Sequence, residues 1–167
     1  MMQLYTKTQI KPFSQRISHD SSILSLGSCF ADNMAKRLNS LKFDVVSSPT
    51  GILFNPESIA LAIERFAAYN NGDSNALPQR NELHYDNGCW FHYDFHSAFS
   101  NSDSDKALAQ MQEAVKLGAE ALKRADTVII TFGSALIYRY NGNHQVVANC
   151  HKQPQRLFTR ELLDAEA

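Results

Sequence analysis

Hydrophobic residues in this chain fall into short continuous runs and longer periodic stretches, and the runs predict strands. Residues 22–26 read Ser-Ile-Leu-Ser-Leu and end on Gly27. Residues 42–46 form a second run, and residues 126–131, Asp-Thr-Val-Ile-Ile-Thr, form a third. Runs of this length next to turn residues are typical of strands inside a sheet. We therefore expect three sheet strands, of which the third is the most clearly buried.

Three stretches with apolar residues three and four positions apart predict helices. They begin at Ser28, at Asn55 and at Asp103 or Ser104, and the last two run to about residues 69 and 124. Asn55 is followed by Pro and Glu, which suit the cap, the first position and the positive end of a helix. The positions expected to face the core are Ile59, Ile63, Phe66 and Ala67 in the second helix and Leu108, Met111, Val115, Leu117 and Leu122 in the third.

Two Asn-Gly pairs between short apolar runs predict β-hairpins, because such pairs supply the positive φ angles of a tight turn. The first hairpin joins residues 83–85 to residues 90–93. The second joins residues 136–140 to residues 145–148. The polar residues 70–80 are expected to form a surface loop.

The order of these elements predicts an α/β fold, with a parallel sheet sandwiched by helices and β-hairpins inserted into it. A last helix is expected to open at Thr159, close to the end of the chain. Open α/β sheets usually contain more than three strands, and no strand follows this last helix. We therefore expect residues 1–167 to form a single incomplete domain that is truncated at its C-terminus.

Composition and charge limit the classes of partner and the cellular location that we expect for this protein. Hydrophobic residues make up 44% of the chain and the net charge is −1, which argues against nucleic acid and against an acidic membrane surface as partners. The N-terminus lacks the apolar core of a signal peptide, and no run approaches the roughly 20 apolar residues of a membrane span. The three dispersed cysteines form no CxxC pair. We expect a cytoplasmic protein without a cofactor.

Candidate chemistry gathers where the predicted strands end, which is where ligands bind in open α/β folds. The segments concerned are residues 27–29 (Gly-Ser-Cys), Gly51 and residues 133–135 (Gly-Ser-Ala). A nucleophile at the start of a helix benefits from the positive end of the dipole and from free N–H groups that can hold an oxyanion. Glycine lets the backbone approach a substrate closely. The structural alternative is that small residues are needed wherever a strand turns tightly into a helix.

A metal site is the other candidate for this part of the chain. His92, Asp94 and His96 alternate along a predicted strand, so that their side chains would share one face. A zinc site would need further ligands, such as His84. Because exposed strands also carry histidine and aspartate freely, we expect no metal.

The chain resembles the GSCFA family at five places, in the family's order. Residues 26–31 read Leu-Gly-Ser-Cys-Phe-Ala, the signature for which the family is named. The other four are Gly51 with Phe54-Asn55-Pro56, Phe95-His96-Ser97 with Phe99, residues 131–135, and residues 147–152 with Pro154. The matches extend over most of the chain, so they indicate membership rather than a chance motif.

The resemblance implies a fold like that of the SGNH (GDSL-type) hydrolases, with a nucleophile after the first strand. In this chain the nucleophile is then Cys29 or, after a shift of one residue, Ser28, and the oxyanion-hole glycine is Gly51. The family pattern of Gly-x-Asn reads Gly133-Ser134-Ala135 here, so the usual side-chain donor is missing and Asn149 is a possible replacement. The late Asp-x-x-His pair of that pattern would lie beyond residue 167.

Residues 149–152, Asn-Cys-His-Lys, offer further polar groups. In a functional interpretation His151 acts as an acid or base and Lys152 holds an anionic group. The alternative is a polar loop after a hairpin, with Cys150 packed as a small hydrophobic residue. His96 is a candidate to line the cleft.

Two functional hypotheses follow. In the first, the protein hydrolyses or transfers an acyl group, through a nucleophile at residue 28 or 29. In the second, the scaffold has lost its chemistry and binds a small-molecule or carbohydrate-like ligand, for which the alanine at position 135 is the motive.

Overall fold

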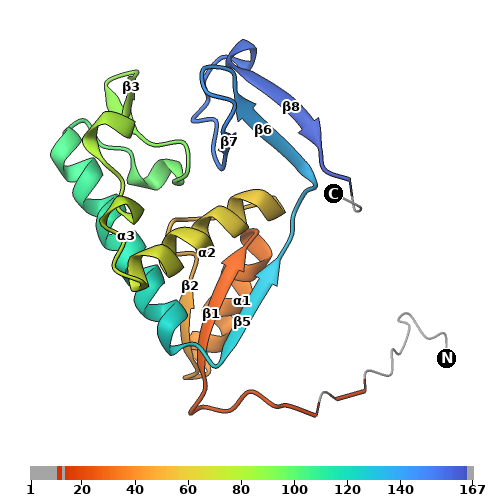
Figure 1. Cartoon of the computed structure of the whole chain (residues 1–167). Coiled ribbons are helices and arrows are strands. Elements are labelled where there is room, and N and C mark those ends of the chain that lie inside the picture. The colour runs from red at the N-terminus through yellow and green to blue at the C-terminus, as the bar shows by residue number, and fades with distance from the viewer. Residues whose placement is uncertain (1–10, 13, 165–167) are drawn as a thin grey trace.

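A three-stranded parallel sheet forms the centre of the protein. The computed structural model describes residues 11–12 and 14–164. Strands β1 (Ser22–Gly27), β2 (Asp44–Ser47) and β5 (Thr127–Thr131) pair in the order β2-β1-β5, and β1 lies between its two parallel partners (Figure 1). The three predicted sheet strands and their parallel arrangement are confirmed.

Helices cover both faces of this sheet. The alternation of β1 sends Leu24 and Leu26 into a core shared with α2 (Pro56–Asn70) and α3 (Ser104–Arg124). It sends Ile23 to the opposite face, where it packs against Ala35 of α1 (Cys29–Ser40). The mixed α/β fold with a sheet flanked by helices therefore agrees with the prediction.

The caps that were read from the sequence fix where the two long helices begin. The Asn55 side chain accepts a hydrogen bond from the Ser58 N–H at 2.8 Å, and Asp103 accepts from residues 105 and 106. The helices approach so closely that a β-carbon at Gly118 would collide with the ring of Phe66. This close contact seals the main core, in which Phe66 and Met111 are fully buried.

The remaining strands form two small antiparallel sheets. Strands β3 (His84–Asp86) and β4 (Cys89–Phe91) make the first predicted hairpin, and its turn residues Asn87 and Gly88 have the expected positive φ angles. The other sheet has the order β7-β6-β8. Its strands are β6 (Leu136–Tyr140), β7 (Val146–Val147) and β8 (Phe158–Leu162). Short 3-10 helices are η1 (Ser74–Ala76), η2 (Arg80–Glu82), η3 (Ser97–Phe99) and η4 (Gln155–Leu157).

The prediction of a helix that begins at Thr159 is wrong, because this segment is strand β8. All five residues of β8 pair with β6, from Phe158 opposite Tyr140 to Leu162 opposite Leu136. Ladder hydrogen bonds to a neighbouring strand outweigh the weak helix signal of a single threonine.

The prediction that the third sheet strand is the most clearly buried is also wrong. Strand β5 is an edge strand, and Val128 and Ile130 are 42% and 41% exposed. Leu117 of α3, expected in the core, is likewise exposed. An apolar run shows that a strand suits a sheet, but it does not say how much of each face a helix covers.

The strand predicted over residues 90–93 ends at Phe91. The next residues form a turn in which the Phe95 N–H donates to the His92 carbonyl at 3.1 Å. His92, Asp94 and His96 therefore do not share one strand face, so the geometry that motivated a metal site is absent. In the described part of the chain no three His, Cys, Asp or Glu side chains are grouped to hold a metal ion.

No helix among the described residues has the length and apolar character of a membrane span.

Candidate functional site

The turn after β1 depends on glycine at position 27. Gly27 has a φ of 129°, a conformation that other residues rarely adopt, and a β-carbon there would collide with the carbonyl oxygen of Thr131. The Ser28 N–H donates to the same carbonyl at 3.1 Å. The end of β5 is thereby held directly against the turn at which α1 begins.

The Ser28 hydroxyl is part of this connection. Ser28 caps α1 by accepting from the Phe30 N–H at 3.3 Å, and its oxygen lies 3.0 Å from the hydroxyl oxygen of Thr131. The residue is only 7% exposed. Its hydroxyl is therefore buried and already used to start the helix.

Cys29 has the opposite environment. It is the first residue of α1 and is exposed, whereas Cys89 and Cys150 are half-buried. Burial raises the pKa of the Cys150 thiol. The first N–H groups of a helix have no acceptor inside the helix, so the exposed thiol lies beside N–H groups that can donate to a bound ligand.

Gly133 brings the loop after β5 to the same place. A β-carbon at Gly133 would lie 3.2 Å from the β-carbon of Ser28 and 2.9 Å from the ring of Phe54. The N–H groups of Gly133 and Ser134 both donate to the carbonyl of Phe54, at 2.8 and 2.9 Å. The predicted site residues at the ends of β1 and β5 are thus neighbours, and the Gly133 N–H has an acceptor within the protein.

Gly51, after β2, lies against His96 instead. It has a φ of 98°, and a β-carbon there would collide with the β-carbon of His96. The Gly51 N–H donates to the Ser48 carbonyl at 2.8 Å, and the His96 N–H donates to the Thr50 carbonyl at 3.0 Å. Glycine is therefore required here by the backbone and by this close approach.

His151 is held in a defined orientation. Its backbone has a φ of 49°, and its N–H donates to the side-chain oxygen of Asn149 at 2.8 Å. The ring stacks on Phe91, with centroids 4.4 Å apart, and Nε2 lies 3.0 Å from the carbonyl oxygen of His92. Because a carbonyl can only accept, this contact assigns a proton to Nε2.

Burial lowers the pKa of His151, and hydrogen bonds to the His92 and Phe95 backbones offset part of that effect. The nearby imidazoles of His92 and His96 lower the pKa further. His151 is therefore a neutral imidazole at neutral pH, which is the form that can accept a proton. Lys152, the next residue, is exposed and has no side-chain partner among the described residues.

The predicted site residues form two groups. Ser28, Cys29 and Gly133 make the first, and Gly51, His96, Asn149 and His151 make the second. The two are linked through the chain, because the segment from Thr50 to Phe54 contacts both. Within the described residues no hydrogen bond joins His151 to Ser28 or Cys29.

Sequence reasoning missed two residues that build the turn, Thr131 and Phe54. The Thr131 hydroxyl lies beside Ser28, and the Phe54 carbonyl accepts hydrogen bonds from the loop after β5. Both residues lie within segments that carry the family resemblance, but their contribution is made largely by backbone atoms, which a side-chain motif does not reveal.

Comparison with known proteins gives one match. The sequence model of the GSCFA family matches residues 22–167, which covers most of the chain and all of the residues discussed above. No curated protein matches, and no solved structure matches.

Proposed function

Because the chain belongs to the GSCFA family, we propose that it is an acyl hydrolase or acyltransferase of the SGNH type with Cys29 as its nucleophile. The observation that carries the proposal is the exposure of the Cys29 thiol at the first position of α1, at the carboxyl end of β1. The choice of Cys29 over Ser28 follows from burial. An approaching ester can reach an exposed thiol, whereas the Ser28 hydroxyl is covered and caps the helix.

In the proposed reaction His151 acts as the base. Its Nδ1 takes the proton from the Cys29 thiol, and the sulfur forms a bond to the acyl carbon of the substrate. The ester C–O bond then breaks, and the leaving oxygen takes the proton from His151. Water attacks the acyl carbon of the thioester, the C–S bond breaks, the proton from the water passes to the sulfur through the same imidazole, and the carboxylic acid is released. No hydrogen bond joins these two side chains within the described residues, so the proposal requires them to come together when the substrate binds. Catalytic contacts that are long in an empty site often shorten in this way.

An activated acyl ester tests the proposal. p-Nitrophenyl acetate is mixed with the protein, and the intact mass and the modified peptide are determined on the wild type and on Cys29→Ala. We expect one acetyl group on Cys29 and none in the variant. Cys89→Ala serves as the matched control and is expected to acylate like the wild type. Acylation distributed equally over the three cysteines, or unchanged in Cys29→Ala, contradicts the proposal.

A binding module on the same scaffold is the second candidate, and a specific observation favours it. The N–H groups of Gly51 and Gly133, which would hold an oxyanion, donate to the carbonyls of Ser48 and Phe54. Position 135 is alanine, so it has no side-chain donor to replace them. On this proposal the protein binds a small or carbohydrate-like molecule without turning it over. An ester turnover that is lost in Cys29→Ala excludes it.

A further inference from the structure

A large cavity lies away from the Cys29 turn. It has a volume of about 700 Å³, within the range of small-molecule sites in proteins. Its walls come from α2, from η2 and β3, from the turn that follows β4, and from the β6–β7 hairpin. The described residues that line it include none of Ser28, Cys29, Gly51 or His151.

One wall of the cavity is aromatic. The rings of His84, Tyr93 and Tyr140 all contact one another, with centroids 4.5, 5.0 and 5.8 Å apart. Desolvation raises the pKa of Tyr93 to about 12 and lowers the pKa of His84. The His84 and Tyr93 rings are therefore neutral at neutral pH. Electron-rich rings of this kind attract cations that lie over their faces.

The charged lining is acidic overall. Both guanidinium groups are already paired, Arg65 with Asp94 at 2.7 Å and Arg139 with Glu57 at 3.3 Å and Glu161 at 2.7 Å. Glu64 and Glu82 also line the cavity. Glu82 accepts a hydrogen bond from the Gln79 N–H at 2.6 Å, and neither carboxylate forms an ion pair with a residue that the structure describes. Four lining carboxylates against two guanidinium groups leave the cavity with an uncompensated negative charge.

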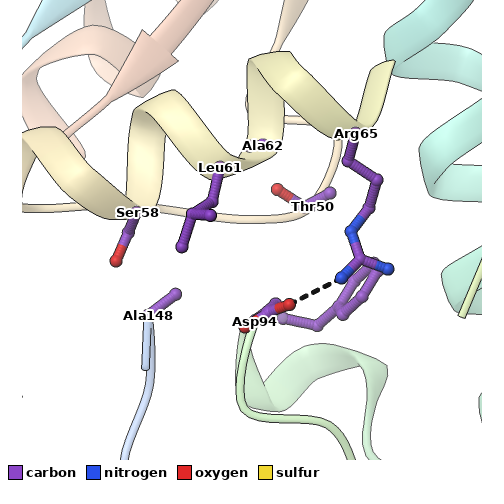
Figure 2. Close-up of a pocket in the computed structure, with 8 residues that line it drawn as sticks. Thr50, Ser58, Leu61, Ala62, Arg65, Asp94 and Ala148 are labelled. Atoms are coloured by element: carbon purple, nitrogen blue, oxygen red, sulfur yellow. Dashed lines mark hydrogen bonds and ion pairs between the residues drawn. The ribbon is translucent and has the colours of Figure 1, made fainter. Parts of the chain in front are cut away.

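A small recess adjoins the cavity. Figure 2 shows it between α2 and the turn that carries Asp94. The recess and the cavity share Leu61, Arg65 and Asp94 in their linings. The recess has a volume of about 10 Å³, enough for about one water molecule or one small polar group.

Two unpartnered hydroxyl groups line the recess. Thr50 and Ser58 are 2% and 4% exposed, and their oxygens have no hydrogen-bond partner among the described residues. A buried hydroxyl without a partner costs free energy, so these groups favour an occupant that can hydrogen-bond to them.

We propose that this cavity binds a small organic cation that carries hydroxyl groups, such as an amino sugar or an amino alcohol. The ammonium group lies between Glu64, Glu82 and the aromatic wall, and a hydroxyl group or its water reaches Thr50 and Ser58. The paired state of Arg65 and Arg139 argues against an anion as the ligand. The proposal stands without the proposed acyl chemistry, because the two sites share no residue.

Binding is tested with D-glucosamine, choline and D-glucose, which separate the cation from the sugar. The amide NMR signals of the full chain are followed during each titration. We expect saturable shifts at cavity residues with glucosamine or choline, and none with glucose. Shifts with glucosamine alone identify an amino sugar, and shifts with choline alone identify an amino alcohol. Equal binding of glucose, or no saturable shift with either cation, overturns the proposal.

Two variants assign the contacts. Glu64→Gln removes an exposed, unpaired carboxylate and is expected to weaken binding of the cation up to about five-fold, as the loss of an exposed ion pair would. Glu120→Gln, on the exposed face of α3 and outside the cavity, is the matched control. Thr50→Val, which removes an unpartnered hydroxyl, is expected to weaken binding while the protein stays folded. Equal affinity of Glu64→Gln and Glu120→Gln contradicts the cation site.

Discussion

At the scale of single residues, Ser28 and Cys29 show how neighbours in a motif take different tasks. The Ser28 hydroxyl contacts the Phe30 N–H and Thr131, and it is buried. Cys29 follows it on the exposed start of α1. The same Gly-Ser-Cys turn therefore supplies both a structural cap and an accessible thiol. The sequence alone left these two roles open, because burial depends on the distant residues of β5.

The capping role makes a prediction for Ser28→Ala. Loss of an N-cap hydroxyl costs about 1 kcal/mol, and the Thr131 hydroxyl would lose its partner as well. We expect the free energy of unfolding, measured with urea, to fall by about 1 to 2 kcal/mol. Ser102→Ala, at an exposed serine before α3, is the control and should change it little. Equal stability of the two variants contradicts the role of Ser28 as a cap.

At the scale of elements, the sequence located the segments that carry their own start signals. Asn55 and Asp103 predicted the beginnings of α2 and α3, and the Asn87-Gly88 turn predicted the first hairpin. Strand β8 was missed because its only strong signal is its pairing with β6, across a long separation in sequence. Local patterns cannot report a partner of that kind.

The β2–α2 connection offers a sharp test of backbone geometry. Gly51 and Gly72 both have positive φ angles, 98° and 84°, but only Gly51 faces a neighbour, His96, within contact distance. Gly72→Ala is expected to lower the free energy of unfolding by about 1 to 2 kcal/mol through backbone strain. Gly51→Ala should lower it further and displace His96. If the two variants lower the free energy of unfolding in urea by the same amount, and the His96 NMR signals do not change, the approach of Gly51 to His96 is unimportant.

At the scale of the whole molecule, the hairpin region brings one buried histidine, His92, and two half-buried ones, His84 and His151, to the second group of site residues. His92 and His151 are joined by the contact from His151 Nε2 to the His92 carbonyl, and the His84 ring lies nearby against Tyr93, tilted by 47°. The residues were visible in the sequence, but their grouping was not. The metal hypothesis had assumed a continuous strand, whereas a turn follows Phe91. His92 Nδ1 lies 3.8 Å from the Asp94 carboxylate, but His92, Asp94 and His96 do not share one strand face.

These histidines predict that acid destabilises the protein. Burial lowers the pKa values of His84, His92 and His151 below the reference value of 6.5. Between 6.5 and the lower folded values the unfolded chain binds more protons than the folded one, so the free energy of unfolding falls as pH falls through that window. Urea unfolding from neutral pH to about pH 5 measures the effect.

A pair of variants assigns part of this pH dependence to His151. His151→Asn replaces the half-buried imidazole with the side chain of a residue that tolerates its positive φ, and it should make the pH dependence of the free energy of unfolding shallower. His144→Asn is the matched control, because His144 is exposed and also has a positive φ, 60°. If both variants change the dependence equally, burial of His151 is not its cause.

The activation of Cys29 is tested most directly by alkylation with iodoacetamide at one pH, followed by peptide mass spectrometry, on the folded protein and on the protein unfolded in urea. Each cysteine then serves as its own control, because exposure alone cannot make a residue react faster in the folded state than in the open chain. The account predicts that Cys29 reacts faster when the protein is folded, while Cys89 and Cys150 react more slowly. Slower or equal alkylation of folded Cys29 would contradict a nucleophile at this turn.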